Sequence, residues 1–392
     1  MSEMSYLEKL LDGVEVEWKT LGQTCKIETG KLNANAAVDD GEYMFFTTAK
    51  ETSKIDKFRW DTEALLIAGN ANVGEVKHYI GKFEAYQRTY VLTNFDENVS
   101  VRFLYFVLSH SLKKYLEERT NSAAMTYIVL STLENFPIPI PCPDNPEKSL
   151  AIQSEIVRIL DKFTALTAEL TAELNMRKKQ YNYYRDQLLS FDEEQEKPIY
   201  LEKLLDGVEV EWLPLSDLAR IRNGKDHKSL SEGEFPVYGS GGIMRYVDTY
   251  AYNKPSVLIP RKGSLGNLFF IDVPFWTVDT IFYTEIDEAQ IRPKYLYYFL
   301  STVGLGEMNQ AGGVPSQTQS VLNKLKIPIP CPDNPEKSLA IQSEIVRILD
   351  KFDTLTNSIT EGLPREIELR QKQYEYYRDL LFSFPKPETV SN

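Results

Sequence analysis

Two stretches of the chain space apolar residues alternately three and four positions apart, which marks one face of a long helix. In the first stretch the steps are 4, 3, 4, 3 and 4 along Ile152, Ile156, Ile159, Phe163, Leu166 and Leu170. This spacing is typical of a coiled-coil seam. The seam then steps four residues to Leu174, inside the tandem TAELTAEL at 167–174, and resumes at Tyr181, Tyr184 and Leu188. The extra step is a stutter, and the pattern predicts one helix over residues 146–191.

The sequence also predicts where this helix begins. Asn145 can cap the first turn, and Pro146 fits the first helical position because its missing N–H would be unpaired there anyway. Glu147 places negative charge at the positive end of the helix dipole. Asn334, Pro335 and Glu336 repeat the signal, so we predict a second helix from residue 335.

The second seam follows Ile341, Ile345, Ile348, Phe352, Leu355 and Ile359, and later Tyr374, Tyr377 and Leu381. It has four more residues than the first before its tyrosines, and Gly362 and Pro364 lie in that excess. We expect a kink or break there. Two matched seams predict that the helices pack on each other antiparallel. Alternatively they bind helices of another subunit, and both arrangements can hold together.

Between the helical stretches lie two inserts whose sequences are typical of strands. Apolar runs rich in β-branched and aromatic residues are separated by Gly and Asn turns. The inserts share a skeleton at an offset of 192: residues 43–46 match 235–238, Leu66 and Ile67 match Leu258 and Ile259, and Arg102 matches Lys294. One helix is expected in each insert, over 101–116 and 293–303. We predict two copies of one mixed α+β domain with different loops.

The seams and inserts belong to an internal duplication. YLEKLLDGVEVEW occupies residues 6–18 and 200–212, and IPIPCPDNPEKSLAIQSEIVRILDKF occupies 138–163 and 327–352 without a change. KQYNYYRDQLLSF at 179–191 returns as KQYEYYRDLLFSF at 372–384. One repeated frame that holds two different inserts predicts a pseudo-two-fold object with two different faces. Duplex DNA is a target suited to such an object.

Length and composition agree with a soluble two-domain protein. The chain has 392 residues, more than one core usually organises. It has no apolar run long enough to span a bilayer and no opening signal peptide, so we expect a cytoplasmic protein without membrane contact. Cys25, Cys142 and Cys331 are odd in number and lack zinc spacing, which favours reduced thiols.

The charge distribution leaves DNA binding open. The net charge of −13 opposes contact with phosphates. Residues 19–137 nevertheless carry 14 Lys and Arg against 15 Asp and Glu, and residues 213–326 carry 12 against 11. The excess of negative charge therefore lies in the frame, which carries 18 Lys and Arg against 31 Asp and Glu. Near-neutral inserts in an acidic frame fit a protein that touches DNA through few residues and relies on a partner for positive charge, and equally one that never meets DNA.

The inserts differ most in polar residues between shared apolar positions. Arg, Lys, Asn and Gln can read base edges, and Ser and Thr can also donate to DNA. The candidates are Thr47, Thr48, Lys50, Asn70, Asn72, Lys77, Gln87 and Arg88 in the first insert, and Tyr238, Ser240, Arg245, Arg261, Lys262, Ser264 and Asn267 in the second. The turn 261–264 is favoured because two cations stand beside a glycine that allows close backbone approach. Solvated turn residues have the same appearance in sequence.

The sequence contains no complete catalytic motif. The glycines at 69 and 74 are spaced like a phosphate loop, but Glu75 stands where lysine is required. Pro143 and Asp144 with Glu147 and Lys148 resemble a nuclease site compressed into a helix cap. His78, His110 and His227 lack metal or nucleophile spacing. We therefore expect no catalytic residue, metal site or bound cofactor.

The duplicated frame, the YGSGG and RKGSLG elements and the TAEL tandem resemble the specificity subunit of a type I restriction-modification system, in the subfamily with a TAEL repeat in its central conserved region. The resemblance covers the whole chain. It implies target-recognition domains at 1–137 and 200–326, a central conserved region at 138–199 with the first long helix, and a C-terminal conserved region at 327–392 with the second. These helices would join the domains as an antiparallel coiled coil.

The resemblance also implies function and partners. The subunit would read a bipartite asymmetric site in double-stranded DNA, without catalysis, and assemble with two methyltransferase and two restriction subunits. S-adenosylmethionine, ATP and Mg²⁺ would bind those partners. The target sequence does not carry over, because the inserts differ. The alternative is a coiled-coil scaffold that binds proteins and does not recognise DNA; acidic charge favours it, but it leaves the loop chemistry unexplained.

Overall fold

The computed structural model describes residues 6–11, 13–119, 127–191, 199–205, 207–308 and 315–385. The chain forms two compact units. Unit 1 comprises residues 1–169 and 367–392, and unit 2 comprises residues 170–366. Unit 1 thus takes its last segment from the far end of the chain. No helix in the described part combines the length and hydropathy that crossing a bilayer requires.

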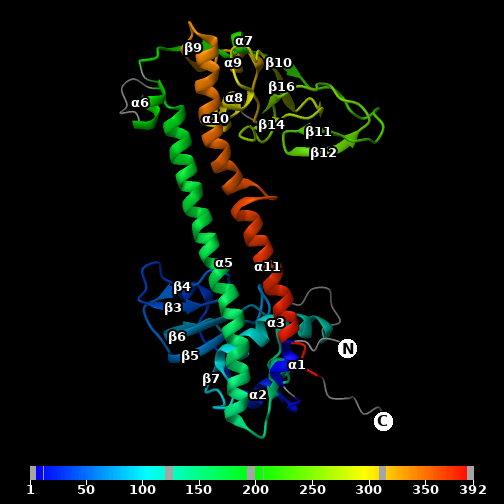
Figure 1. The fold of residues 1–392 in the computed structure, drawn as a ribbon. Coiled ribbons are helices and arrows are strands. Elements are labelled where there is room, and N and C mark those ends of the chain that lie inside the picture. Colours follow the sequence, from blue (N-terminus) through cyan, green and yellow to red (C-terminus); the bar gives the residue numbers. More distant parts are fainter. Residues whose placement is uncertain are drawn as a thin grey trace. The chain divides into compact units, whose positions relative to one another are not determined.

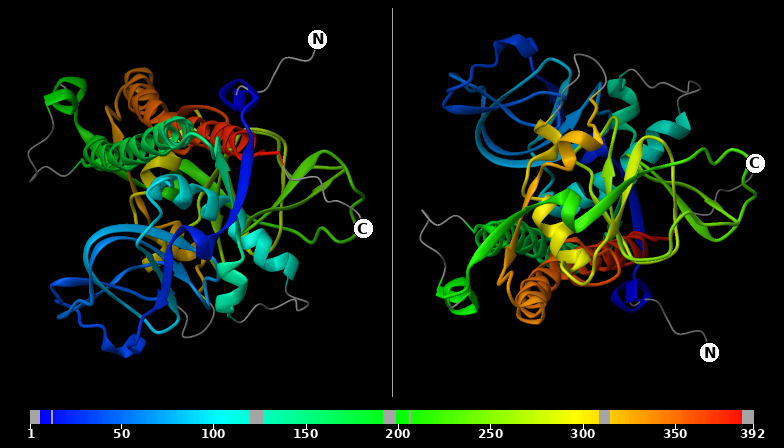
Figure 2. Two further views of the ribbon diagram at one scale, coloured as in Figure 1. Left: turned by 90° about the horizontal axis from the view of Figure 1, so that it is seen from below. Right: turned by 90° about the horizontal axis from the view of Figure 1, so that it is seen from above.

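Unit 1 is built on a six-stranded sheet in the order β2-β7-β5-β6-β3-β4. Its elements are α1 (Tyr6–Leu11), β1 (Val16–Thr20), α2 (Leu21–Thr24), β2 (Lys26–Thr29), the 3-10 helix η1 (Ala34–Ala36), β3 (Tyr43–Phe46), β4 (Ser53–Ile55), β5 (Trp60–Ala68), β6 (Val76–Ala85), β7 (Thr89–Thr93), α3 (Val101–Arg119), α4 (Leu130–Glu134), β8 (Pro137–Pro141), the first part of α5 (Pro146–Leu189) and most of α11 (Gly362–Leu381). β3 runs parallel to β6, and the other neighbours are antiparallel. The strands, blue to cyan in Figure 2, curve, and α3 packs against β5 and β6 (Figure 1).

Unit 2 has the same strands divided between two sheets, in the orders β10-β16-β13-β14 and β12-β11-β15. Its elements are the end of α5, α6 (Ile199–Leu205), β9 (Val210–Pro214), α7 (Leu215–Leu218), β10 (Ala219–Asn223), β11 (Phe235–Gly239), β12 (Gly242–Val247), β13 (Ser256–Pro260), β14 (Phe269–Ile271), β15 (Trp276–Thr277), β16 (Ile281–Ile286), α8 (Pro293–Leu300), the 3-10 helix η2 (Leu305–Glu307), α9 (Gln319–Leu322), β17 (Lys326–Pro330), α10 (Pro335–Asn357) and the start of α11. The long strand β6 corresponds to β14 and β15 together. Pro274 lies between these two strands and cannot donate to a ladder, which accounts for the interruption.

Strand registers confirm the shared skeleton of the inserts. In unit 1 Phe45 of β3 lies opposite Glu84 of β6 in a parallel pair. In unit 2 the residues 192 positions later, Val237 and Trp276, form the same parallel pair. The predicted insert helices are also present, as α3 and α8. The prediction of two α+β domains of one design is therefore confirmed.

The central strand of each unit contains a buried apolar run, residues 64–68 of β5 and 257–260 of β13, because both faces of its sheet are covered there. Leu65 and Ile67 of β5 belong to the main core with α3, while Leu66 between them joins a second cluster with Phe46 and Phe83. Successive strand residues point to opposite faces, so the run supplies two cores. In β13 of unit 2, Val257 and Ile259 alternate in the same way with Leu258.

The long helices pair within each unit as the seams predict. In unit 1 the first part of α5 and α11 run in opposite directions (Figure 1), and the ring of Phe163 stacks on Tyr377 with centroids 5.4 Å apart. In unit 2 the ring of Phe352, on α10, stacks on Tyr184 of α5 at 5.4 Å. Each stack joins the long repeat of one half to the tyrosine block of the other half. The antiparallel packing of the two seams is therefore confirmed within each unit.

The helix boundaries follow the local signals. Asn145 and Asn334 each accept a hydrogen bond from the N–H three residues later, at 3.0 and 3.1 Å, as caps do. α5 is continuous through the stutter, whereas the second helix breaks after Asn357 and restarts at Gly362. Gly362 has φ +72°, and a Cβ there would lie 2.4 Å from the carbonyl oxygen of Thr354. The predicted break is confirmed.

One seam residue was assigned wrongly. We expected Ile359 in the second seam, but it lies in the break and is 78% exposed. Leu166, near the middle of the first seam, is also 37% exposed, while Ile152 and Ile156 are buried in the domain core. The seams are thus buried most where they meet a domain as well as the partner helix, because the domain covers a wider face of the helix than a single helix can.

A fully buried glutamine fastens each domain to its long helix. Gln153 of α5 accepts from the backbone N–H of Ser100 at 2.8 Å and donates to the carbonyl of Asn98 at 3.0 Å. Gln342 of α10 makes the same bonds with Arg292 and Gln290, at 2.8 and 3.1 Å. These backbone groups precede α3 and α8, so a side chain supplies partners that a helix start lacks.

We expect Gln153→Leu to lower the free energy of unfolding by about 1–3 kcal/mol, because two buried backbone groups lose their partners while the side-chain volume is kept. Urea unfolding of the purified chain measures the change. Gln371→Leu, at an exposed position of α11, is the matched control and should shift stability by less than about 0.5 kcal/mol. Equal effects at both positions would show that the glutamine clamp contributes nothing.

Candidate nucleic-acid interface

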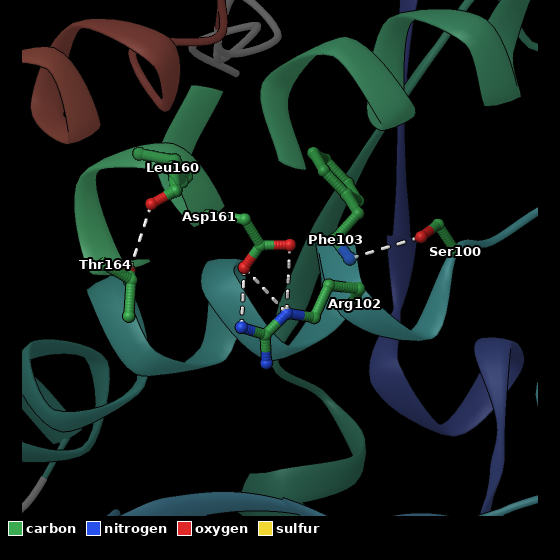
Figure 3. Close-up of polar contacts among 6 residues, drawn as sticks. All are labelled: Ser100, Arg102, Phe103, Leu160, Asp161 and Thr164. Carbon is green, nitrogen blue, oxygen red and sulfur yellow. Dashed lines mark hydrogen bonds and ion pairs between the residues drawn. The ribbon is translucent and has the colours of Figure 1, made fainter. Parts of the chain in front are cut away.

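An ion pair at equivalent positions sets each domain on its long helix. Arg102 of α3 donates through Nε and Nη2 to Asp161 Oδ1 of α5, at 3.0 and 2.6 Å (Figure 3). In unit 2 Lys294 of α8 pairs with Asp350 of α10 at 2.8 Å. The acidic partner comes from the repeated frame and the basic residue from the variable insert. The frame therefore accepts either cation and orients the loops beyond it.

In unit 2 a second side chain forms a hydrogen bond with the carboxylate of Asp350. The hydroxyl of Tyr298 donates to Asp350 Oδ1 at 2.6 Å. Burial, followed by the hydrogen bond to Asp350, raises the pKa of Tyr298 well above its ordinary range. The phenol therefore stays protonated at neutral pH and remains a donor.

Two of the first-insert candidates hold a neighbouring turn in place. Asn72 Nδ2 donates to the carbonyl of Thr48 at 2.7 Å. Lys77 Nζ donates to the carbonyls of Ala49 and Lys50, at 2.8 and 2.7 Å. These bonds tie the turn after β3 to the start of β6. The structure thus brings four candidates together, and it gives Asn72 and Lys77 an internal role as well.

Exposure separates the first-insert candidates further. Lys50, Gln87 and Arg88 are exposed, Thr47, Asn70, Asn72 and Lys77 are half-buried, and Thr48 is buried. Thr47 Oγ1 accepts from the N–H of Ala49 at 3.2 Å. The side-chain oxygen of Asn70 is buried and has no hydrogen-bond partner among the described residues. Only the three exposed side chains present their polar ends fully to solvent.

Gln87 and Arg88 border a cavity of about 300 Å³ at the β6–β7 turn. Its lining consists of Thr29, Gly69, Gln87, Arg88, Tyr90, Tyr127 and Ile128. Gly69 allows two backbone segments to approach closely beside the cavity, because a Cβ there would lie 2.5 Å from the carbonyl oxygen of Arg88. Tyr127 is 58% exposed. Sequence reasoning missed Tyr127, which has no repeated counterpart to draw attention to it.

The second-insert candidates converge on one turn. Asn267 Nδ2 donates to the carbonyl of Ser240 at 3.2 Å, and the N–H of Ser240 lies 3.3 Å from Thr280 Oγ1. The N–H of Arg261 donates to the carbonyl of Thr280 at 2.8 Å. Lys262 and Ser264 are exposed in the same turn. Residues from two separate segments thus form one polar surface, which we call the cationic turn: Ser240, Arg261, Lys262, Ser264 and Asn267.

Two second-insert candidates are used elsewhere. Tyr238 is 8% exposed, its ring lies 5.8 Å from that of Phe269, and burial raises its pKa. Arg245 donates to the carbonyl of Leu230 at 3.0 Å and is half-buried. Tyr238 is thus part of the core, and Arg245 braces a loop, so we leave both out of the proposed contact surface.

The two units place different side chains around an equivalent backbone hydrogen bond. Gly69 donates its N–H to the carbonyl of Arg88 at 2.9 Å, and Arg261 donates to that of Thr280 at 2.8 Å. Residues 69 and 261 are 192 positions apart, as are 88 and 280. In unit 1 the cation of this pair is therefore Arg88, directly before β7. In unit 2 it is Arg261, directly after β13, on the other side of the hydrogen bond. Thr280 was missed, although its offset from Arg88 could have identified it.

The described residues offer no group of three or more His, Cys, Asp or Glu side chains placed to hold a metal ion. Cys25 is buried, and burial raises the pKa of its thiol to about 12, so it is a protonated core residue at neutral pH. The polar surfaces described above can therefore offer hydrogen bonds and positive charge to a ligand. They suit phosphate and base-edge contacts.

The domain repeat matches a known family. The description "Type I restriction modification DNA specificity domain" applies to residues 13–177 and again to residues 207–369. The Type I restriction enzyme EcoR124I/EcoR124II specificity subunit of Escherichia coli is 42% identical, with 100% of both chains covered. The Type I restriction enzyme EcoprrI specificity subunit of Escherichia coli is 35% identical over 92% of this chain and 93% of its own.

A solved structure has the same fold. The S subunit of a type I restriction-modification system from M. genitalium has a TM-score of 0.63 and 20% identity, and 96% of this chain and 98% of that one are covered. At this identity the likeness concerns the fold alone. The sequence matches above carry the family relationship.

Proposed function

The chain belongs to the family of type I restriction-modification specificity subunits, and from this we propose how its two domains read DNA. It is the DNA-recognition subunit, and the catalytic activities of such systems lie on partner subunits. We propose that unit 1 and unit 2 each read one half of a bipartite, asymmetric site in duplex DNA. The exposed residues Lys50, Gln87 and Arg88 would act in unit 1 and the cationic turn in unit 2.

The observation that carries this proposal is the pair of equivalent positions with exchanged chemistry. Gly69 and Arg88 in unit 1 correspond to Arg261 and Thr280 in unit 2, on matching backbone hydrogen bonds. A structural requirement would preserve side chains at such positions, as it preserves the buried glutamines of the frame. Divergence of the side chains around an equivalent backbone hydrogen bond is what two readers of different base sequences require.

We propose that the frame recruits two methyltransferase subunits, and that two restriction subunits join them. The repeated frame presents the same exposed ring twice: Tyr183 in unit 2 and Tyr376 in unit 1 are 60% and 66% exposed. Each packs on the next tyrosine, with centroids 5.4 and 5.3 Å apart. Exposed, rigid aromatic residues are common anchors of protein interfaces. Two identical anchors fit two copies of one partner.

The partners would bring what this chain lacks. The net charge of −13 opposes phosphate contact, so we propose that the methyltransferases supply much of the positive charge that holds DNA. S-adenosylmethionine would bind to them, and ATP and Mg²⁺ to the restriction subunits. The assembly would act in the cytoplasm, where its target DNA lies. A protein-binding scaffold without DNA recognition accounts for the frame but not for the divergent polar positions.

Co-expression with the methyltransferase tests the function. The complex should bind one bipartite duplex and methylate it, and neither subunit alone should do so. In this complex Arg261→Ala should weaken DNA binding by about 1–3 kcal/mol and relax one base position if Arg261 reads a base, or weaken all sequences alike if it holds a phosphate. Arg158→Ala, on the frame helix α5, is the control for loss of a cation. Methylation without sequence preference would overturn the proposal.

A further inference from the structure

The tip of the β11–β12 hairpin carries an exposed apolar pair that plays no part in the hydrogen-bonding and charge chemistry of the cationic turn. Ile243 and Met244 are 50% and 59% exposed, and they follow the glycines at 241 and 242. The two strands lie on the side of unit 2 away from α10 (Figure 1), and the yellow-green strands are at the edge of unit 2 in both views of Figure 2. The packing of the described part of unit 2 does not account for two large apolar side chains at this tip.

A β-bulge accounts for their joint exposure. Tyr238 pairs with Ile243 and Val237 pairs with Arg245, so Met244 has no partner on β11. In a regular strand, two consecutive side chains point to opposite faces, and one of this pair would turn toward the core. The extra residue of a bulge re-aims side chains, and bulges often occur beside functional sites. Here it leaves two adjacent apolar side chains in solvent.

The hairpin tip is fastened to the cationic turn. Asn267 bonds to the carbonyl of Ser240 at the tip, and a Cβ on Gly263 would lie 3.3 Å from Ser240 Oγ. Met244 folds back over Gly239, where a Cβ would lie 2.8 Å from its Sδ atom. The apolar pair and the cations therefore sit on one connected surface.

Two cations, Arg261 and Lys262, stand on the same surface as the apolar pair. The guanidinium of Arg261 lies over the ring of Phe282, 5.8 Å from its centroid. Lys262 Nζ is 3.9 Å from Asp279 Oδ2, and both side chains are largely exposed. Such an exposed pair is weak and can exchange for a phosphate. A surface with exposed apolar side chains flanked by Arg and Lys has the composition of proteins that unstack a DNA base step.

Unit 1 lacks this feature at the same place. The hairpin equivalent to β11–β12 is β3–β4, and the residues between its strands include Thr47, Thr48 and Lys50. Large apolar side chains are missing from that turn, whose sequence is TTAKET at 47–52. The apolar tip is therefore a property of the second domain alone, which turns the first domain into an internal control.

We propose that Ile243 and Met244 form an apolar wedge that enters a base step in the half-site read by unit 2, while Arg261 and Lys262 hold adjacent phosphates. The proposal rests on the proposed function. Partial unstacking costs free energy that depends on the base step, and it is lowest at flexible pyrimidine–purine steps. The wedge would thus make unit 2 sensitive to DNA deformability as well as to base edges, and unit 1 would lack that sensitivity.

The test uses the assembled methyltransferase complex and a duplex carrying its site, once methylation mapping has given the sequence. 2-Aminopurine replaces one base at a time in either half-site, except the adenines that become methylated and the bases next to them, because a methyltransferase takes its target base out of the stack. Its fluorescence rises when its neighbours unstack. We expect a rise within the second half-site and none within the first.

Variants identify the residues responsible. Ile243→Ser with Met244→Ser should abolish the rise and lower affinity about tenfold, whereas Met244→Leu should keep both. Ile80→Ser, at an isoleucine of β6 that is 67% exposed, is the matched control and should leave the second half-site signal unchanged. Because all these side chains are exposed, thermal unfolding should be unaffected.

Three results would overturn the wedge. If the wild-type complex methylates its site without any fluorescence rise in the second half-site, unit 2 reads DNA without unstacking it, and the proposed function stands. If the double Ser variant keeps the rise, other residues cause it. If that variant loses the methyltransferase instead, the tip is a protein-docking surface. Failure of the proposed function is distinct, because the complex would then show no sequence preference at all.

Discussion

Replacing residues 19–137 by the corresponding insert of another family member should change one half of the recognised DNA site and leave the other half intact. The structure makes this exchange feasible, because the insert leaves and re-enters the frame at one point. Lys19 and Thr20 at its start pair with Ile138, the first frame residue after it, and Pro137, its last residue, in the ribbon of β1 and β8. A foreign insert therefore needs only to present its two ends side by side.

The exchange should abolish recognition of the original sequence in one half-site. Each mismatched base pair costs about 1–3 kcal/mol, so a half-site of several base pairs should lose methylation completely. Methylation mapping of cells that carry the exchanged chain and its methyltransferase gives the result directly. The donor insert must bring a basic residue at the position of Arg102 to pair with Asp161, as Lys294 does with Asp350 in unit 2.

The chain contains its own matched donor. Leu213 and Pro214 pair with Ile327 and Lys326 in β9 and β17, so the second insert enters its frame through the same ribbon. Placing residues 213–326 into the first frame should yield a protein that reads the second half-site sequence at both positions. Altered specificity on both sides after a single foreign exchange would contradict the modular interpretation.

The second large effect is expected from the length of α5. Inserting one further TAEL after Leu174 should lengthen the unread spacer between the half-sites by about one or two base pairs. Four residues add about 6 Å of helix, and a base pair occupies about 3.4 Å of the DNA axis. The tandem lies where unit 1 ends, after Glu169, and unit 2 begins, at Leu170. Its residues belong to neither domain core, so both half-site sequences should remain unchanged.

Helix rotation supplies the control. Four residues turn the helix by about 40° beyond a full turn, whereas a single alanine after Leu174 turns the downstream part of α5 by about 100°. The single insertion should misalign the stacks of Phe163 on Tyr377 and Phe352 on Tyr184 and abolish assembly. Deleting one TAEL should shorten the spacer or prevent assembly. An unchanged spacer after the TAEL insertion would mean that α5 does not set the distance.

Several features of this protein follow from the sequence alone, because they depend on neighbours along the chain. The cap at Asn145, the seam through Phe163 and the break before Gly362 are local signals, and each has the predicted structure. The duplication extended these local signals to the second half, and the offset of 192 located equivalent strands in inserts with little identity. The repeated frame also carried the family relationship.

The role of each polar candidate depended on tertiary structure. Asn72 and Lys77 bond to the carbonyls of a turn more than twenty residues away, and Tyr238 is covered by a separate strand. In the sequence, such residues cannot be told from Lys50 or Arg88, which stay exposed. The reason is that a polar side chain near a turn meets either solvent or a distant backbone, and only the folded chain decides which.

Tertiary pairing also decided the features that the sequence pattern concealed. Gln153 lies in a polar stretch of the frame, yet it is fully buried because the start of α3 packs over it. Ile359 continued the apolar spacing but lies in the break. The bulge at Met244 arises from a register shift between two strands. Spacing along the chain specifies which face a residue occupies, whereas burial and register depend on what the rest of the protein places against that face.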